Sequence, residues 1–158
     1  MTNDSVLSRE QVLGESVDIL SKNGFSVVSD APLQRIDNTH QRVFEDAYSV
    51  VAIVFFDSWN DLRHAWIDVQ ASFVEMISKH FTKEDRKSWE AYLVLLSTDL
   101  VPFRETTCAR EIRYNTNHVR ELLGTGEQVK EISDVETCLL PLLPIQRGST
   151  LDASSNVL

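Results

Sequence analysis

The sequence predicts a single domain of the mixed α/β (α+β) class, in which helices pack against a small mixed sheet. Two nearly continuous apolar runs, at 48–56 and 92–96, have the composition of strands that are covered on both faces. Between them, apolar residues recur every three or four positions, as in a long amphipathic helix. A strand, a helix and a following strand favour a right-handed crossover, so we expect the two strands to be parallel in one sheet.

Length and composition fit one domain over residues 1–147, followed by a disordered tail over 148–158. The chain has 158 residues, of which 42% are apolar and 25% are charged, and these values are typical of a globular protein. A chain of this length buries enough surface to fold without a disulfide or a metal. From Gly148 onward, Ser, Thr, Asn and small residues predominate, which indicates a disordered end.

The charge balance and the cysteines indicate a protein of the cell interior. Lys and Arg number 15 and Asp and Glu number 24, so the net charge of −9 argues against non-specific binding along a nucleic-acid backbone. The longest apolar run, at 50–56, is far shorter than the ~20 residues that span a bilayer. The first eight residues lack the pattern of a signal peptide. Cys108 and Cys138 form no CxxC motif, which is typical of reduced thiols. We therefore expect a cytoplasmic protein without membrane contact.

The first helix is the best-marked element of the chain. Ser8 and Gln11 fit a capping box, apolar residues follow at helical spacing as far as Leu20, and Asn23-Gly24 supplies a stop. Residues 25–28 are a short strand candidate. Residues 33–47 stay undecided between a loop, a ragged strand and a short helix.

The strand at 48–56 leads directly into the longest predicted helix. Asp57-Ser58 caps its start, and an apolar stripe runs from Trp59 to Phe81. A charged loop is expected at 83–87, before the second apolar strand.

The last third of the chain is predicted to be helical. A helix is expected over 104–123, with a break near Tyr114, and 124–126 is a loop. Ser133 and Glu136 fit a second capping box, which opens a short helix limited by Pro141.

Four side chains near the start of the long helix have the chemistry of metal ligands. Asp57, Asp61, His64 and Asp68 follow one another at helical spacing, and carboxylates beside an imidazole can bind a divalent ion. Acids near a helix N-terminus also complement the macrodipole, and an amphipathic helix has such a polar face. The second interpretation is simpler, so we predict no catalytic residue, no metal and no cofactor.

A partner-binding surface is predicted in the C-terminal third. The segment 104–120 contains four arginines and two glutamates, so its local charge is positive. If the segment is one helix, the last three arginines lie near one another, as at a surface that binds an acidic partner. The segment 139–145 is also more apolar than a short terminal helix requires. The alternative is a solvated helix face with Glu111 and Glu121 as ion-pair partners. The predicted partner-binding residues are Arg110, Arg113, Arg120, Leu139, Leu140 and Leu143.

The order of elements resembles the core of the restriction-endonuclease-like nucleases. That resemblance implies an acid on one strand and, on the next, a carboxylate two residues before a lysine, which together hold Mg²⁺. Here the apolar strand ends at Asp57 with no lysine two positions later, and the acid-x-Lys of 85–87 falls in the charged loop. We expect a degenerate, inactive core. A metal-dependent nuclease with an atypical site, using Asp57 and Glu15, is the alternative.

Several stretches together resemble the small middle component of bacterial ABC-three-component defence systems. The resemblance extends over about 43–145, and Glu121 stands where the family usually has a basic residue. The stretches are VFEDAYSVVA at 43–52, FDSWNDL at 56–62, KSWEAYLVLL at 87–96, IRYNTNHVR at 112–120, DVE at 134–136 and LLPLLP at 139–144.

The resemblance implies an accessory subunit without chemistry of its own. In such operons an SMC/RecF-like ABC-type ATPase is encoded with a middle protein and an effector, often a nuclease. The implied partners are this ATPase and effector, with DNA contact only within the complex. A nuclease and a stand-alone regulatory binding module are the competing function classes.

Overall fold

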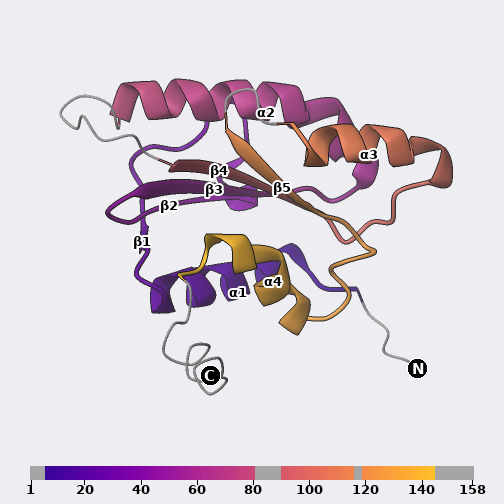
Figure 1. The fold of residues 1–158 in the computed structure, drawn as a ribbon, viewed down its shortest axis with the longest axis horizontal. Helices are drawn as coiled ribbons and strands as arrows, with labels where there is room; N and C mark the ends of the chain where they lie inside the picture. Colours follow the sequence, from indigo (N-terminus) through magenta and orange to yellow (C-terminus); the bar gives the residue numbers. More distant parts are fainter. Residues whose placement is uncertain (1–5, 81–89, 116–118, 145–158) are drawn as a thin grey trace, which may run out of the picture.

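A five-stranded mixed sheet forms the middle layer of the molecule (Figure 1). The computed structural model describes residues 6–80, 90–115 and 119–144. β2 is antiparallel to both of its neighbours, whereas β3, β4 and β5 run parallel, as expected for β3 and β4. In spatial order the strands are β1 (Ser26–Val27), β2 (Gln41–Glu45), β3 (Ser49–Phe55), β4 (Glu90–Leu96) and β5 (Arg120–Gly124).

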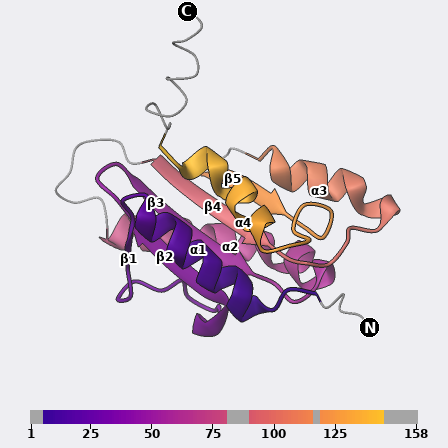
Figure 2. The same cartoon turned by 90° about the horizontal axis from the view of Figure 1, so that it is seen from below.

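Helices cover both faces of this sheet, and the predicted mixed α/β class is confirmed. α2 (Trp59–His80) and α3 (Thr106–Arg113) lie on one face (Figure 1). α1 (Arg9–Lys22) and α4 (Ser133–Leu139) lie side by side on the other (Figure 2). Because successive strand residues point to opposite faces, β3 and β4 supply side chains to two separate hydrophobic cores.

The two best-marked helix starts are confirmed. Ser8 and Gln11 form the expected capping box at α1, with hydrogen bonds of 3.1 and 2.8 Å. Ser58 Oγ accepts a hydrogen bond from the Asp61 amide at 3.0 Å and so caps α2. The apolar stripe of α2 is buried against the sheet, with Phe73 fully enclosed.

The undecided segment 33–47 contains a loop, a 3-10 turn (Asn38–His40) and strand β2. Gln41 begins this strand with a buried side chain, where an apolar residue would be expected. The side-chain oxygen of Gln41, Oε1, accepts a hydrogen bond from the Leu33 N–H at 2.7 Å. Its side-chain nitrogen, Nε2, donates to the carbonyls of Leu33 at 3.1 Å and Ile36 at 3.0 Å. The Gln41 side chain thus supplies hydrogen-bond partners to backbone groups of the loop. Because Gln41 is polar, the alternation of apolar and polar residues that marks a strand is not visible at this position.

The predicted helix over 104–123 is wrong in its second half. The chain forms a 3-10 turn (Phe103–Glu105) and α3, and then turns into β5, which pairs with β4 in parallel register. The strand alternates, with Leu123 in the core below α2 and α3 and Leu122 packed on the core below α1 and α4. Pairing with β5 satisfies backbone groups along the edge of β4, which a helix in this place would have left without strand partners.

The second predicted capping box is also wrong, although its helix is present. Ser133 makes no capping hydrogen bond, whereas Asp134 Oδ2 accepts from the amides of Lys130 at 2.8 Å and Glu131 at 2.9 Å. The helix ends at Leu139, and the 3-10 turn Leu140–Leu142, which contains Pro141, follows it, so Pro141 limits the helix as expected. The predicted tail and charged loop lie outside the described residues. In the described ranges, the apolar stretches of the helices fall short of a membrane span.

Candidate functional site

The three arginines of the predicted partner surface do not lie together. Arg110 and Arg113 belong to α3. Arg120 begins β5, and its guanidinium lies 5.8 Å from the centre of the Tyr92 ring, which belongs to the core on the opposite face of the sheet. The prediction of one basic helix face is wrong because the chain changes from helix to strand between these residues.

The three leucines of the prediction also differ in their surroundings. Leu139 is fully buried in the core below α1 and α4, and Leu143 packs partly buried against it. Leu140 has 55% of its surface exposed. The apolar character of this segment is therefore largely accounted for by the core, and Leu140 alone is well placed for an external contact.

Arg110 and Arg113 line a groove of about 260 Å³ between α3 and the loop after β5. The Arg113 guanidinium donates to the Leu123 carbonyl at 3.4 Å. Burial raises the pKa of Glu127, but hydrogen bonds from Thr125 and from the Val101 amide, together with the Arg113 charge, bring it below its ordinary value. The other lining residues are Val101, Thr106, Ala109, Tyr114, Thr125, Glu127 and Gln128.

The loop between β4 and α3 presents two large apolar side chains to solvent beside this groove. Phe103 is 91% exposed and Leu100 is 62% exposed. Neither residue stood out in the sequence, since an isolated Phe beside a proline is equally typical of a buried loop. In the sequence they lie on either side of Val101, which lines the groove, and exposed apolar side chains at one place are a feature of interaction surfaces.

This loop is held in place by contacts to two other segments, the start of α2 and the loop after β5. Asp99 Oδ2 accepts from the Trp59 amide at 2.8 Å, and the Asp99 carbonyl accepts from the Gly126 amide at 2.7 Å. The Val101 amide donates to Glu127 Oε2 at 3.0 Å. Glu105 fixes the far end of the loop, because its Oε1 accepts from Trp59 Nε1 and pairs with Arg63, both at 3.1 Å. The backbone is thus ordered while Phe103 and Leu100 point outward.

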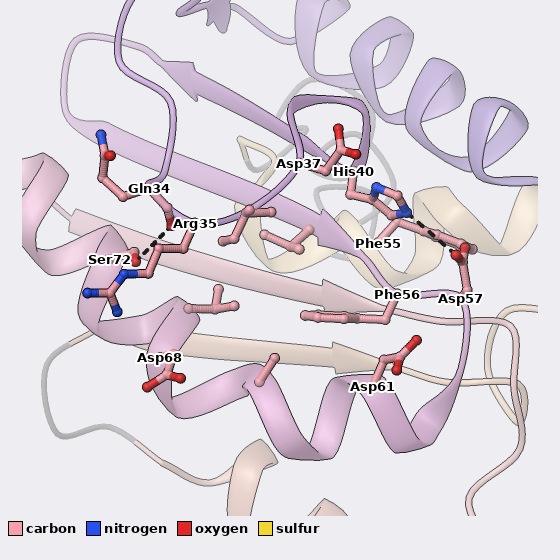
Figure 3. Close-up of a pocket in the computed structure, with 14 residues that line it drawn as sticks. Gln34, Arg35, Asp37, His40, Phe55, Phe56, Asp57, Asp61, Asp68 and Ser72 are labelled. Atoms are coloured by element: carbon pink, nitrogen blue, oxygen red, sulfur yellow. Dashed lines mark hydrogen bonds and ion pairs between the residues drawn. The ribbon is translucent and has the colours of Figure 1, made fainter.

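A second cavity, of about 270 Å³, lies between α2 and the loop before β2 (Figure 3). Asp57, Asp61 and Asp68 line it, so three of the four potential metal ligands do come to one place. His64 does not, because its Nδ1 is 2.8 Å from the Asn60 carbonyl. The histidine that lines the cavity is His40, whose Nε2 lies 3.5 Å from Asp57 Oδ2. Within the described ranges, no three His, Cys, Asp or Glu side chains are arranged to hold a metal ion.

The acids of the alternative nuclease site are not brought together. Glu15 lies on α1, which covers one face of the sheet, whereas Asp57 lines the cavity beside α2 on the other. The acid-x-Lys at 85–87 lies outside the described residues.

Glu121 is the least expected polar residue of the molecule. It points from β5 toward α2, is 5% exposed, and one of its carboxylate oxygens is buried without a hydrogen-bond partner. Gln70 donates to the other oxygen and also to Asn115 Oδ1 at 3.0 Å. Burial raises the pKa of Glu121 to about 7, against a smaller lowering by the Gln70 hydrogen bond. The alternative that Glu121 forms a helical ion pair with an arginine is therefore wrong.

Comparison with models of protein families, with curated proteins and with solved structures finds no match to this chain.

Proposed function

We propose that this protein is a partner-binding accessory subunit, and that it uses the surface formed by the β4–α3 loop and the groove along α3. The observation that carries this proposal is the exposure of Phe103 on a loop whose backbone is fixed on both sides. An isolated chain gains nothing from an ordered aromatic side chain in water, whereas a partner can bury it.

An ordered loop lowers the cost of association. Binding energy is reduced by the entropy lost when side chains and loops become ordered at an interface. Here Asp99 and Glu105 hold the loop before any partner arrives. Aromatic and arginine side chains also provide a large share of interface energy. Phe103 and Arg110 are exposed residues of these two types on neighbouring elements.

The partners follow from the resemblance to the middle component of ABC-three-component systems. We take them to be the SMC/ABC-type ATPase and the effector of the same operon, with the present chain linking the two as a non-catalytic subunit in the cytoplasm. DNA would be contacted only within the assembly. A metal-dependent nuclease is the alternative function.

A pull-down with the products of the neighbouring genes tests this proposal. Phe103→Ala should weaken the complex by ~2 kcal/mol or more, since Phe103 is the most exposed aromatic side chain among the described residues. Ile67→Ala is the matched control, because Ile67 is 62% exposed on α2 but away from the groove. Equal retention of partners by both folded variants would contradict the proposal.

The alternative is tested on the purified chain with Mg²⁺ or Mn²⁺ and linear, circular or single-stranded DNA. We expect no cleavage. Metal-dependent cleavage that is lost in Asp57→Ala would favour the nuclease instead.

A further inference from the structure

The cavity beside α2 has a roof that is fixed by hydrogen bonds (Figure 3). The buried Gln41 side chain holds the loop through Leu33 and Ile36. Ser72 Oγ of α2 donates to the Gln34 carbonyl at 3.2 Å and ties the same loop to the helix. The space between loop and helix is therefore formed without any ligand. A preformed cavity binds a small molecule without the cost of ordering its walls.

The floor of this cavity is apolar. Val54 and Phe56, at the end of β3, and Val69 of α2 line it with buried side chains, and Ala65 lies one turn before Val69. Figure 3 shows the Phe56 side chain beside α2, among the residues that line the cavity. Such a floor favours the hydrocarbon part of a ligand over a bare ion.

The rim of the cavity is strongly negative. Four aspartates line it against one arginine, Arg35, while His40 and Asp57 lie 3.5 Å apart. Asp37 is already engaged, since it accepts from the amide and hydroxyl of Thr39, both at 2.9 Å. Asp61 carries no side-chain ion pair or hydrogen bond to other described residues, and lies with Asp57 at the end of the cavity away from Arg35 (Figure 3). A cation is the charge that this end would attract.

We infer that this cavity is a binding site for a small organic cation, a primary amine carried on an apolar body. The ammonium group would lie between the carboxylates of Asp57 and Asp61, and the apolar body would rest on Phe56, Ala65 and Val69. An ammonium close to an aromatic ring gains further from the charge distribution of the ring. A metal ion fits less well, because the described side chains offer no three-ligand group. This site is separate from the groove along α3, so it does not depend on the proposed function.

Phenethylamine and 2-phenylethanol are the probes that test this inference, because they share a body and differ in the charged group. Isothermal titration of the full chain should give saturable binding of the amine, with a Kd of ~1 mM or lower as expected for so small a ligand. The alcohol should bind at least tenfold more weakly. Raising the salt concentration should weaken binding of the amine, because its contacts are partly exposed.

Two variants locate the site. Asp61→Asn should weaken amine binding about fivefold or more, whereas Asp18→Asn, which makes the same charge change on the exposed side of α1, should not alter it. Ala65→Leu should block the cavity while leaving the rim charges in place, and its folding is checked by a thermal melt. Absence of saturable binding, equal binding of the alcohol, or equal loss in both aspartate variants would overturn the inference. Binding of a lysine-rich peptide without binding of the amine would also overturn it, in favour of a protein-docking pocket.

Discussion

Gln70 on α2 donates a hydrogen bond to Glu121 on β5, and this is the sole hydrogen bond that the buried Glu121 carboxylate receives from the described residues. The other carboxylate oxygen, Oε1, is buried away from water and has no hydrogen-bond partner. Leaving a buried polar atom unpaired costs about 1–3 kcal/mol. This pair is therefore a point of built-in weakness between the sheet and its longest helix.

The stability of the protein should fall as the pH rises through the titration of Glu121. Its pKa in the folded state is raised to about 7, above the ordinary value of 4.5, so folding favours the protonated form. The stabilisation that protonated Glu121 gives to the folded state is fully present below about pH 4.5 and is lost as the pH rises from there to about 7. Urea denaturation of Glu121→Gln should show a gain over the wild type that grows to about 2 kcal/mol across this range. A difference that is independent of pH would contradict this assignment.

The apolar stripe of α2 should account for a large part of the folding energy. Trp66→Ala and Phe73→Ala should each lower the free energy of unfolding by ~3–5 kcal/mol, because both side chains are buried against the sheet. Ile67→Ala, on the exposed side of the same helix, should change it by no more than about 0.5 kcal/mol. Chemical denaturation measures all three. Near-neutral effects at Trp66 and Phe73 would be incompatible with the packing described above.

Charge-reversal variants of Arg110 and Arg120, which lie on opposite faces of the sheet, should show which face binds the partner. Arg110→Glu should weaken binding of the operon partners by about 1–2 kcal/mol, since Arg110 lines the groove along α3. Arg120→Glu is the control, because this residue contacts Tyr92 on the other side of the sheet. Pull-down and titration calorimetry of folded variants report the difference. A larger loss in Arg120→Glu would move the interface to the side of α1 and α4.

Two glycines should respond in opposite directions to alanine. A Cβ at Gly126 would lie 2.6 Å from the Thr98 carbonyl oxygen, so Gly126→Ala should destabilise the protein by about 1–3 kcal/mol. Gly14 lies inside α1 with nothing near its missing Cβ, and Gly14→Ala should stabilise by about 0.5–1 kcal/mol. Thermal and chemical denaturation of both variants provide the comparison. A neutral Gly126→Ala would imply that the two loops can separate at little cost.

The elements that the sequence predicts well are those in which local and long-range signals agree. The cap at Ser8 and the apolar run of β3 are examples, since each matches its final environment. The sequence leaves β2 undecided and predicts a helix in place of β5, because a polar residue occupies an inward position in each strand. Gln41 and Glu121 are acceptable there only because of partners distant in sequence, Leu33 and Gln70.

The same limit applies to the candidate sites. A continuous helix would place Arg120 near Arg110, but Arg120 lies in strand β5, and its side chain contacts Tyr92 on the opposite face of the sheet. The grouping of Asp57 with Asp61 was correct because both belong to one helix start, but His40 arrives from a different element. Phe103 carries no sequence signal at all, since its exposure depends on the hydrogen bonds that hold its loop.

Asp99 joins segments that are far apart in the chain, with its carboxylate on the amide of Trp59 and its carbonyl on the amide of Gly126. Neither amide can meet solvent unless this single residue moves. In hydrogen–deuterium exchange, the amide protons of Trp59 and Gly126 should therefore exchange at similar rates, as one opening unit. Asp99→Asn should speed both together, whereas the capped amide of Gln11 in α1 should keep its own rate.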